Sequence, residues 1–598
     1  MCGIAGILTT QPGSADLERV LLQTQKELRH RGPDDAGLWI QPASIAAFSH
    51  NRLSILDLSS AGHQPMSTPD GALTITFNGE IFNFLELRAS LERDGIQFQS
   101  HSDTEVILRL YEKHGRDCVK QLRGMYAFAI WDERDRSCFI ARDPFGIKPL
   151  YFAQSAGTFI FASELRPLLS SGLVPRHIDS AALARYFLTG SMPEPHTAVD
   201  AIKLLEAGTT LIWKDGQVQQ HRWWNFHFAS GESSITREEA IRTTRAALVD
   251  SVEHHFVSDV PVGVFLSGGI DSTALLALAH ASGRRNIQTF SIGVDDSSRD
   301  ESRMARRTAE HFGTRHTEMR LDADKARELF REFLNAVDQP TIDGFNTFTV
   351  SALAREQGIK VVLSGLGGDE MFAGYPSFNK LPSLDRVSKA LGPFKGIAGQ
   401  ALQMLSGHPP LVRLGSALCD GGTLPQLYDA FRGIFSSRHA RVLARHLTGE
   451  EPPRVPDSSR DETPATPSPR DAVSVLEMSR YMRNQLLRDS DVMSMAHGLE
   501  LRVPLLDVSL FHAVSSIPAQ YRLEQGKQLL LAAVPEIPDW IRNRPKGGFL
   551  FPYEQWLASP DWRALFEKEL GDIPVPLTNW YQRWSIFVFK RWRAAVGL

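Results

Sequence analysis

The pattern of apolar and turn-forming residues changes partway along the chain, so its two parts must fold differently. Up to about residue 224, short apolar stretches are separated by turn residues such as Asn78-Gly79. Helical spacing of apolar residues appears between some of these stretches. The first part therefore predicts an α+β domain of layered sheets, with strands at 72–77, 125–131, 138–141 and 158–162 and helices at 15–28, 84–94 and 104–114.

The second part alternates apolar strands with helical patterns, which is typical of an α/β domain with a doubly wound parallel sheet. Its predicted strands lie at 260–266, 288–294 and 359–363. The chain has 598 residues, whereas one hydrophobic core stops growing at about 250–300 residues. We therefore expect two domains, at residues 2–215 and 235–598. The stretch at 450–470 has almost no apolar residues and is predicted to be a polar insertion.

The composition excludes several classes of protein. Hydrophobic residues make up 42% of the chain and charged residues 22%, with a net charge of −4, so no global basic field for nucleic acid is present. No apolar stretch reaches the length of about 18 residues that spans a membrane, and the N-terminus lacks the features of a secretory signal. The four cysteines show no spacing typical of a disulfide framework or a zinc site. We expect a cytoplasmic protein.

Cys2 occupies an unusual position. If Met1 is removed, the Cys2 thiol lies beside a free α-amine whose pKa of about 8 suits a general base. Nucleophile and base would then belong to one residue. A small second residue is also common by chance, so Cys2 alone is a weak signal.

Five motifs follow one another in an order that resembles the class II, N-terminal-nucleophile glutamine amidotransferases. They are Cys2-Gly3-Ile4-Ala5-Gly6, Arg29-His30-Arg31-Gly32-Pro33-Asp34, Asn51-Arg52-Leu53-Ser54-Ile55, Asn78-Gly79-Glu80 and Ser102-Asp103-Thr104-Glu105. Taken singly, Asn-Gly is a common hairpin turn and Ser-Asp-Thr-Glu a common helix cap. Their joint order behind Cys2 favours the functional interpretation.

This resemblance implies an αββα sandwich of the N-terminal-nucleophile hydrolase type and assigns roles to its residues. Cys2 would attack the side-chain carbonyl of glutamine, and Asn78 with the Gly79 N–H would bind glutamine and form the oxyanion hole. Arg52 would bind the glutamine carboxylate, and Glu80 and Asp103 its ammonium group. Residues 122–128 and 141–150 also match the family and are interpreted as scaffold and domain interface.

Two glycine-rich turns in the second part predict a phosphate site. Ser267-Gly268-Gly269-Ile270-Asp271-Ser272 leads from a strand into a helix, where N–H groups and the helix dipole favour phosphate. Ser364-Gly365-Leu366-Gly367-Gly368-Asp369-Glu370 follows the strand at 359–363. Tight connections alone would also explain such turns. Neither turn has the Walker lysine or the dinucleotide-binding spacing. The aspartates Asp271 and Asp369 are suitable ligands for magnesium.

The first turn resembles the pyrophosphate-binding loop of enzymes that split ATP into AMP and pyrophosphate. The residues 488–504 match the synthetase domain of the asparagine synthetase family, and Lys527 with 544–549 resembles its phosphate-side lysine and closing loop. The resemblance makes Lys527 catalytic, because it would offset charge as pyrophosphate leaves. The implied ATP-binding residues are Leu266, Ser267, Gly268, Gly269, Asp271, Ser272, Ile292, Ser364 and Gly365.

Together the motifs imply a glutamine-dependent asparagine synthetase that uses ATP and Mg²⁺. Ammonia released at Cys2 would pass through an internal passage and attack an aspartyl-adenylate, giving asparagine, AMP and pyrophosphate. The expected partners are small molecules (glutamine, ATP, and aspartate or another carboxylate), without nucleic acid or membrane. Whether the chain forms a homodimer is left open.

Two positions depart from the family pattern on the side of the acceptor. Leu366 stands where the family commonly has an acidic residue, and Leu531 where it often has an arginine. A ligase of the same family that amidates another carboxylate, on a sugar or a peptide, is therefore kept as an alternative. A non-catalytic sensor is disfavoured by the intact motif set, and ring closure without ammonia is disfavoured by the presence of Cys2.

Overall fold

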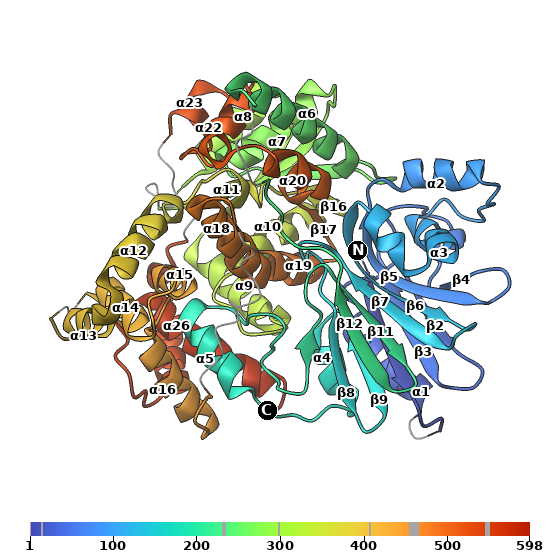
Figure 1. Ribbon diagram of the computed structural model, residues 1–598, viewed down its shortest axis with the longest axis horizontal. Helices are drawn as coiled ribbons and strands as arrows, with labels where there is room; N and C mark the ends of the chain where they lie inside the picture. The colour runs from blue at the N-terminus through green and yellow to red at the C-terminus, as the bar shows by residue number, and fades with distance from the viewer. Residues whose placement is uncertain are drawn as a thin grey trace.

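The computed structural model describes residues 2–13, 16–229, 235–296, 300–405, 408–453, 466–544 and 551–598. Figure 1 shows a pair of sheets at one end of the molecule and a third sheet near its middle. Parts of three predicted features lie outside the described residues: 230–234 near the predicted domain boundary, 454–465 of the polar insertion and 545–550 of the closing loop.

The N-terminal part is a sandwich of two antiparallel sheets. The first has the order β10 (Lys203–Leu204), β8 (Tyr151–Ser155), β9 (Thr158–Ala162), β1 (Gly3–Thr9), β3 (Ala46–Arg52), β2 (Asp35–Ile40). The second has the order β12 (Gln217–Arg222), β11 (Thr209–Lys214), β7 (Ser137–Arg142), β6 (Gly124–Asp132), β5 (Leu73–Ile81), β4 (Met66–Ser67). Because β12 pairs with β11, the second sheet continues past the predicted domain end at residue 215.

The two sheets face each other across a hydrophobic core, and helices cover their outer faces. Phe48 and Phe161 of the first sheet share this core with Trp131 and Trp213 of the second. α1 (Leu17–Glu27) and α4 (Leu165–Ser170) pack on the first sheet, while α2 (Phe84–Arg93) and α3 (Asp103–His114) pack on the second. The predicted αββα sandwich is therefore confirmed.

The C-terminal part contains a five-stranded sheet in which all neighbours run parallel. Its order is β15 (Arg315–Leu321), β14 (Gln288–Val294), β13 (Val262–Phe265), β16 (Val361–Leu363), β17 (Glu500–Arg502). α6 (Arg237–His255), α7 (Ile270–Ala281) and α8 (Ser302–His311) share one hydrophobic core with the sheet, and α9 (Ala323–Ala336) and α10 (Phe345–Glu356) share the other. Helices thus cover both faces, which confirms the doubly wound fold.

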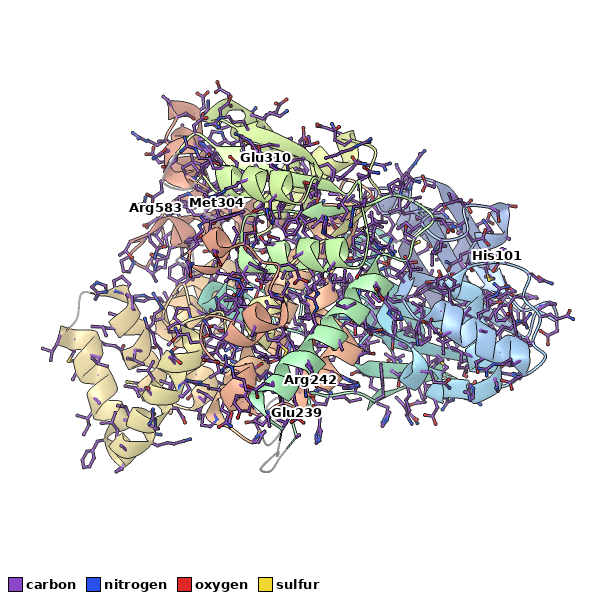
Figure 2. The ribbon with its side chains drawn as sticks, turned by 90° about the horizontal axis from the view of Figure 1, so that it is seen from above. His101, Glu239, Arg242, Met304, Glu310 and Arg583 are labelled. Carbon is purple, nitrogen blue, oxygen red and sulfur yellow. The ribbon has the colours of Figure 1, made fainter. Side chains whose placement is uncertain are left out.

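Further helices complete this domain, and some of them lie at the end of the molecule opposite the sandwich (Figures 1 and 2). They are α12 (Ser377–Leu391), α13 (Lys395–Leu405), α14 (Pro409–Cys419), α15 (Leu424–Arg432), α16 (Ser437–Thr448), α18 (Pro469–Leu476), α19 (Arg488–Met495), α20 (Val508–Ser515), α22 (Gln528–Ala533) and α26 (Trp580–Ala595). Between α18 and α19 the chain forms a π-helical segment, η4 (Glu477–Leu487). α5 (Ser180–Thr189) belongs to the first part of the chain but packs against α26, where the Tyr186 hydroxyl donates to the Ser585 carbonyl over 2.9 Å.

Among the residues described, no helix combines the length and the apolar character needed to cross a membrane.

Candidate active sites

Cys2 lies at the start of β1 and is held against β5. Its backbone N–H donates to the Asn78 Oδ1 atom over 2.9 Å. The Asn78 side chain is fully buried, and its Nδ2 group has no hydrogen-bond partner in the described part of the chain. A buried amide donor without a partner is costly unless something else uses it. Asn78 therefore presents a donor to any oxyanion that forms beside Cys2.

Gly79 has no room for a side chain. A Cβ atom at this position would lie 2.2 Å from the Met125 carbonyl oxygen of the neighbouring strand β6. Glycine therefore lets β5 approach β6 closely, directly after Asn78 and before Glu80. The turn predicted at Asn78-Gly79 is therefore wrong: both residues, with Glu80, stay paired with β6 within one continuous strand.

The Cys2 thiol is buried, and burial raises its pKa above the usual value. The Leu53 backbone N–H and the Arg52 guanidinium act in the opposite direction. The Arg52 guanidinium donates to the carbonyls of Ser59 at 3.0 Å and Leu56 at 3.2 Å, and also to that of Asp57. The loop after β3 thus fixes the predicted carboxylate clamp close to the thiol.

Glu80 and Asp103 bring two carboxylates into the same buried region. Ser102 caps α3 and places Asp103 on its first turn, where the Asp103 Oδ2 atom accepts from the Ile81 N–H over 2.9 Å. Burial raises the pKa of Glu80 well above its usual value and that of Asp103 to about 7, and the nearby Glu500 carboxylate acts in the same direction. An ammonium group bound here would favour the ionised forms.

The C-terminal domain supplies a cation to this region. Arg502 of β17 is fully buried, and its guanidinium lies 3.2 Å from Glu80 Oε2 and 2.6 Å from Glu500 Oε1. Removing one partner of such a buried ion pair typically costs about 3–5 kcal/mol, because the remaining charge is left uncompensated. Sequence analysis assigned no role to Arg502. Arg502 belongs to the family match at 488–504, but its partner Glu80 lies more than 400 positions earlier in the chain, so the sequence did not show their contact.

A second buried cluster joins Cys2 to the C-terminal domain. The Arg31 Nε atom donates to the Cys2 carbonyl over 3.1 Å, and its terminal nitrogens lie 2.8 Å from Glu164 and 2.8 Å from Asp491. The Lys148 Nζ atom is 3.4 Å from the other oxygen of Asp491. The main chain at Cys2 is therefore positioned partly by a residue of α19.

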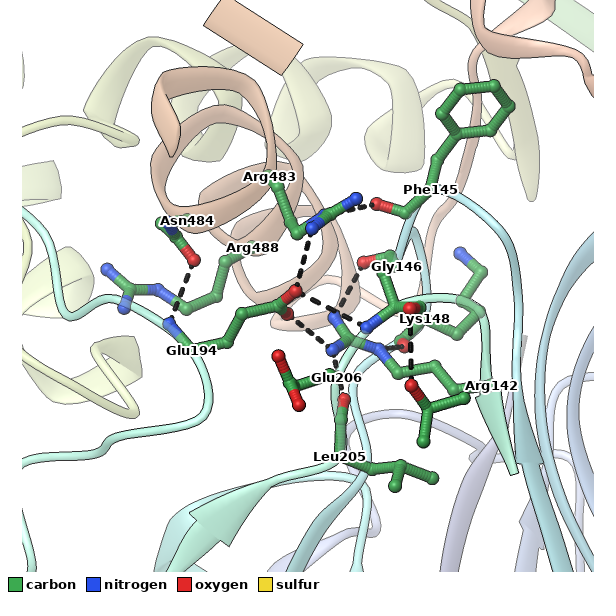
Figure 3. A network of polar contacts seen from close by, with 12 residues as sticks. Arg142, Phe145, Gly146, Lys148, Glu194, Leu205, Glu206, Arg483, Asn484 and Arg488 are labelled. Carbon is green, nitrogen blue, oxygen red and sulfur yellow. Dashed lines mark hydrogen bonds and ion pairs between the residues drawn. The ribbon is translucent and has the colours of Figure 1, made fainter. Parts of the chain in front are cut away.

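A third network is centred on Glu194 (Figure 3). Its carboxylate lies 2.7 Å from Arg142 and 3.0 Å from Arg483, and the Arg483 Nε atom donates to the Phe145 carbonyl over 3.2 Å. The Asn484 Oδ1 atom accepts from the Glu194 N–H over 3.0 Å. Residues 141–150 thus lie at the domain interface, where they were expected.

The two glycine-rich turns line one cavity of about 720 Å³ at the carboxyl ends of β13, β14 and β16. Ligands of open α/β sheets bind at this edge. Of the predicted ATP-binding residues, those that line the cavity are Leu266, Ser267, Gly269, Asp271, Ser272, Ile292, Ser364 and Gly365. The exception is Gly268, which is not among the lining residues. A Cβ atom there would lie 2.7 Å from Met304 Cβ, so Gly268 is required by close packing against α8.

Lys527 joins the two turns. Its Nζ atom lies 2.5 Å from Asp271 Oδ2 and 2.6 Å from Asp369 Oδ1. Burial lowers the pKa of Lys527, but the attraction and hydrogen bonds of the two carboxylates together outweigh burial, so this pKa is raised. The described residues contain no group of three or more His, Cys, Asp or Glu side chains that could hold a metal ion. Two carboxylates that converge on one cation nevertheless fit Mg²⁺, which takes one or two carboxylates and completes its shell with phosphate and water.

Two glycines of the second turn are also required by close packing. A Cβ atom at Gly365 would lie 2.8 Å from Asp271 Cβ, and one at Gly368 would lie 2.2 Å from Asp271 Oδ1. Glycine at both positions lets the second turn approach the first. The predicted closing loop starts at Arg544, which donates to the Gly268 carbonyl over 3.3 Å.

The two departures from the family pattern have different surroundings. Leu366 lines the cavity directly after Gly365, whereas Leu531 is buried in the hydrophobic core and is not among the lining residues. The departure at Leu366 therefore bears on the ligand, and that at Leu531 bears on packing.

The cavity continues beyond the two turns to a wall that sequence analysis did not identify. The Arg432 guanidinium lies 4.2 Å from the ring centre of Tyr375 and 4.0 Å from that of Tyr481. Buried Glu370 accepts from the Tyr375 hydroxyl over 2.9 Å. These residues come from separate segments, so no local pattern could reveal them. Other polar residues that line the same cavity include Asp343, Asn346, Thr347, Arg413, Gln485, Tyr553, Asn579 and Tyr581.

Known proteins resemble both parts of the chain. Residues 1–224 match the family described as glutamine amidotransferase domain, and residues 243–586 match asparagine synthase. Asparagine synthetase [glutamine-hydrolyzing] 1 of Bacillus subtilis is 33% identical over 99% of this chain and 96% of its own length. A putative asparagine synthetase [glutamine-hydrolyzing] of Mycobacterium tuberculosis is 34% identical over 94% and 89%. Amidase chry2 of Gibberella zeae is 26% identical over 94% and 90%. The chain therefore belongs to the glutamine-hydrolysing asparagine synthetase family.

Proposed function

We propose that this ATP-dependent, glutamine-hydrolysing ligase converts aspartate into asparagine. The observation that carries the proposal is one cavity lined by both glycine-rich turns, whose Asp271 and Asp369 also form ion pairs with Lys527, in a chain that also holds a buried Cys2–Asn78 pair. The cavity can activate a carboxylate with ATP, and the site at Cys2 can release ammonia from glutamine. The names of the two asparagine synthetase relatives support aspartate as the acceptor.

At the first site, the proposed reaction needs Met1 removed so that the Cys2 α-amine can accept the thiol proton. The sulfur then attacks the side-chain carbonyl of glutamine, and the developing oxyanion accepts from Asn78 Nδ2. The α-amine gives the thiol proton to the leaving nitrogen, so ammonia departs as the tetrahedral intermediate collapses to a thioester. Water then hydrolyses the thioester and releases glutamate.

At the second site, a carboxylate oxygen of the acceptor attacks the α-phosphorus of ATP, and pyrophosphate leaves. Lys527 is placed to offset the charge of the departing pyrophosphate. Asp271 and Asp369 would hold Mg²⁺, which supplies charge neutralisation on the phosphates. Ammonia then attacks the acyl carbon, loses a proton, and displaces AMP. An internal passage would keep ammonia out of water, where most of it becomes ammonium.

The acceptor is tested directly with amide-labelled ¹⁵N-glutamine, ATP and Mg²⁺. Aspartate is supplied alone or replaced by a panel of sugar and peptide carboxylates, and products are identified by mass spectrometry. We expect ¹⁵N-asparagine together with equal amounts of AMP and glutamate. Absence of labelled asparagine, with another carboxylate amidated, would exclude aspartate as the acceptor.

One observation favours the second candidate, a ligase of this family that amidates a different carboxylate. Leu366 places an apolar side chain in the cavity where the family commonly has an acidic one. The wall formed by Arg432 between Tyr375 and Tyr481 offers a cation and aromatic faces, which suit a larger acceptor such as a sugar or peptide acid. The same panel distinguishes the two candidates.

A further inference from the structure

The strand β17 belongs to the ATP site through its main chain. It pairs in parallel with β16, with Arg502 opposite Leu363. The Arg502 carbonyl accepts from the Ser364 N–H over 2.8 Å. Ser364 begins the second glycine-rich turn and lines the cavity. The position of this turn therefore depends on the main chain of Arg502.

The side chain of the same residue belongs to the glutamine site. Besides Glu80 and Glu500, the Arg502 guanidinium donates to the carbonyls of His255 at 2.8 Å and Val257 at 2.6 Å. The ring of Phe82, two residues after Glu80, lies 5.5 Å from the guanidinium carbon. Partners from β5, β17 and the end of α6 thus surround the guanidinium, which leaves it little freedom to move alone.

The charges around Arg502 give this position a consequence for glutamine. Glu80, Asp103 and Glu500 are all buried carboxylates, and the attraction of Arg502 favours the ionised form of each. Only ionised Glu80 and Asp103 attract an ammonium group strongly. A displacement of β17 that lengthened the distance between Arg502 and Glu80 would therefore weaken glutamine binding.

We propose that Arg502 is a positioning residue that couples the two sites: its carbonyl holds the ATP turn at Ser364, and its guanidinium holds Glu80 for the glutamine ammonium group. Occupation of the ATP cavity is then transmitted along one strand to the glutamine pocket. The proposal rests on the assignment of Glu80 to glutamine made above. Arg502 itself takes part in no bond-making step.

The test measures glutamate release from glutamine with and without ATP and Mg²⁺, in the full chain. We expect ATP to change the KM for glutamine in the parent. In Arg502→Met, we expect the KM for glutamine to rise about tenfold or more and the effect of ATP to disappear. Arg502→Lys keeps the charge and is expected to recover part of the KM. Amide formation from added ammonia should stay within about threefold of the parent, because the main-chain contact to Ser364 remains.

Arg123→Gln is the matched control. Arg123 is also a buried arginine between the domains, with Asp507 at 2.7 Å and Asp250 at 2.7 Å, but it contacts neither site. This variant should keep the parent's response to ATP. An equal loss of the response in Arg123→Gln would overturn the proposal, because any damage to the interface would then suffice.

Two further outcomes decide the matter. A parent whose glutamine KM does not respond to ATP, or an Arg502→Met protein that responds like the parent, overturns the coupling role. If Arg502→Met does not fold, as judged from thermal unfolding and ammonia-dependent activity, the response of Arg502→Lys is decisive. Glu80→Gln separates failure of the Glu80 assignment from failure of the coupling. An unchanged KM for glutamine in Glu80→Gln refutes the assignment of Glu80. A raised KM in Glu80→Gln, together with an Arg502→Met protein that responds to ATP like the parent, refutes only the coupling.

Discussion

If Asp103 binds the glutamine ammonium group as proposed, glutamine use should depend on pH in a predictable direction. Burial and the neighbouring Glu500 raise the pKa of Asp103 to about 7, and the pKa of Glu80 is raised as well. A carboxyl with a raised pKa holds its proton below that value, so the pocket loses negative charge as the pH falls. Glutamine carries an ammonium group that needs this charge. Its binding should therefore weaken below about pH 7.

The size of the effect follows from the ionised fraction. With a pKa near 7, about one tenth of Asp103 is ionised at about pH 6 and about nine tenths at about pH 8, so kcat/KM for glutamine should rise about tenfold between them. Asp103→Asn removes this titration and should flatten the profile. At about pH 8 it should also lower kcat/KM by about 30- to 1,000-fold, because loss of a buried charged partner costs about 2–4 kcal/mol.

The assay is initial-rate glutamate release over about pH 5.5–9, with parent and Asp103→Asn measured side by side. Any slope shared by both proteins belongs to other groups, including the Cys2 thiol and α-amine. The difference between the two profiles reports Asp103. A parent profile without a rise between about pH 6 and 8, or an Asp103→Asn profile with the same rise, would refute the reasoning.

Four further outcomes are expected. Cys2→Ala should lower glutamate release at least about a thousandfold and leave ammonia-dependent amide formation intact, as measured by mass spectrometry; parallel loss of both would contradict the division of labour. Lys527→Met should slow ATP–pyrophosphate exchange about 100- to 1,000-fold while basal glutamate release without ATP is kept, since only the adenylation site loses its cation. Gly368→Ala would place a Cβ atom 2.2 Å from Asp271 Oδ1 and should likewise impair the exchange reaction, whereas Gly396→Ala, where a Cβ atom meets nothing within 4 Å, should not; equal rates would argue against the close approach of the turns. Chelation of divalent cations should stop pyrophosphate release and spare basal glutamate release, and sensitivity of both would place a metal in the glutamine site as well.

Much of the fold follows from local patterns. The strands of the first part and the alternating segments of the second carry strong apolar periodicity, and the structure places β6, β9 and β14 close to their predicted bounds. β5 is longer than predicted, because it continues through Asn78-Gly79 to Ile81. The glycine-rich turns are also visible locally, because the glycines and the helix that follows them are neighbours in the sequence. Most of the cavity-lining residues of both turns could therefore be named from the sequence.

Other features could not be predicted, because they depend on contacts between distant segments. β17 is three residues long and carries Glu500 and Arg502 at its ends, so it has no strand signature of its own. It is ordered by pairing with β16 and by charges of the other domain. The wall around Arg432 is assembled from helices on both sides of the predicted insertion, and its position in the cavity appears only in the folded chain.

The π-helical segment η4 faces two ways, which restricts how acceptor preference can change. Tyr481 and Gln485 line the ATP cavity, while Arg483 and Asn484 bind Glu194 across the interface. Insertion or deletion of a residue here would rotate the cavity-lining side chains and the Glu194-binding side chains together. A change of acceptor made in this way would therefore also disturb the contact between the domains. Redesign should instead begin at Leu366, which borders the cavity from a turn with no contact to Glu194.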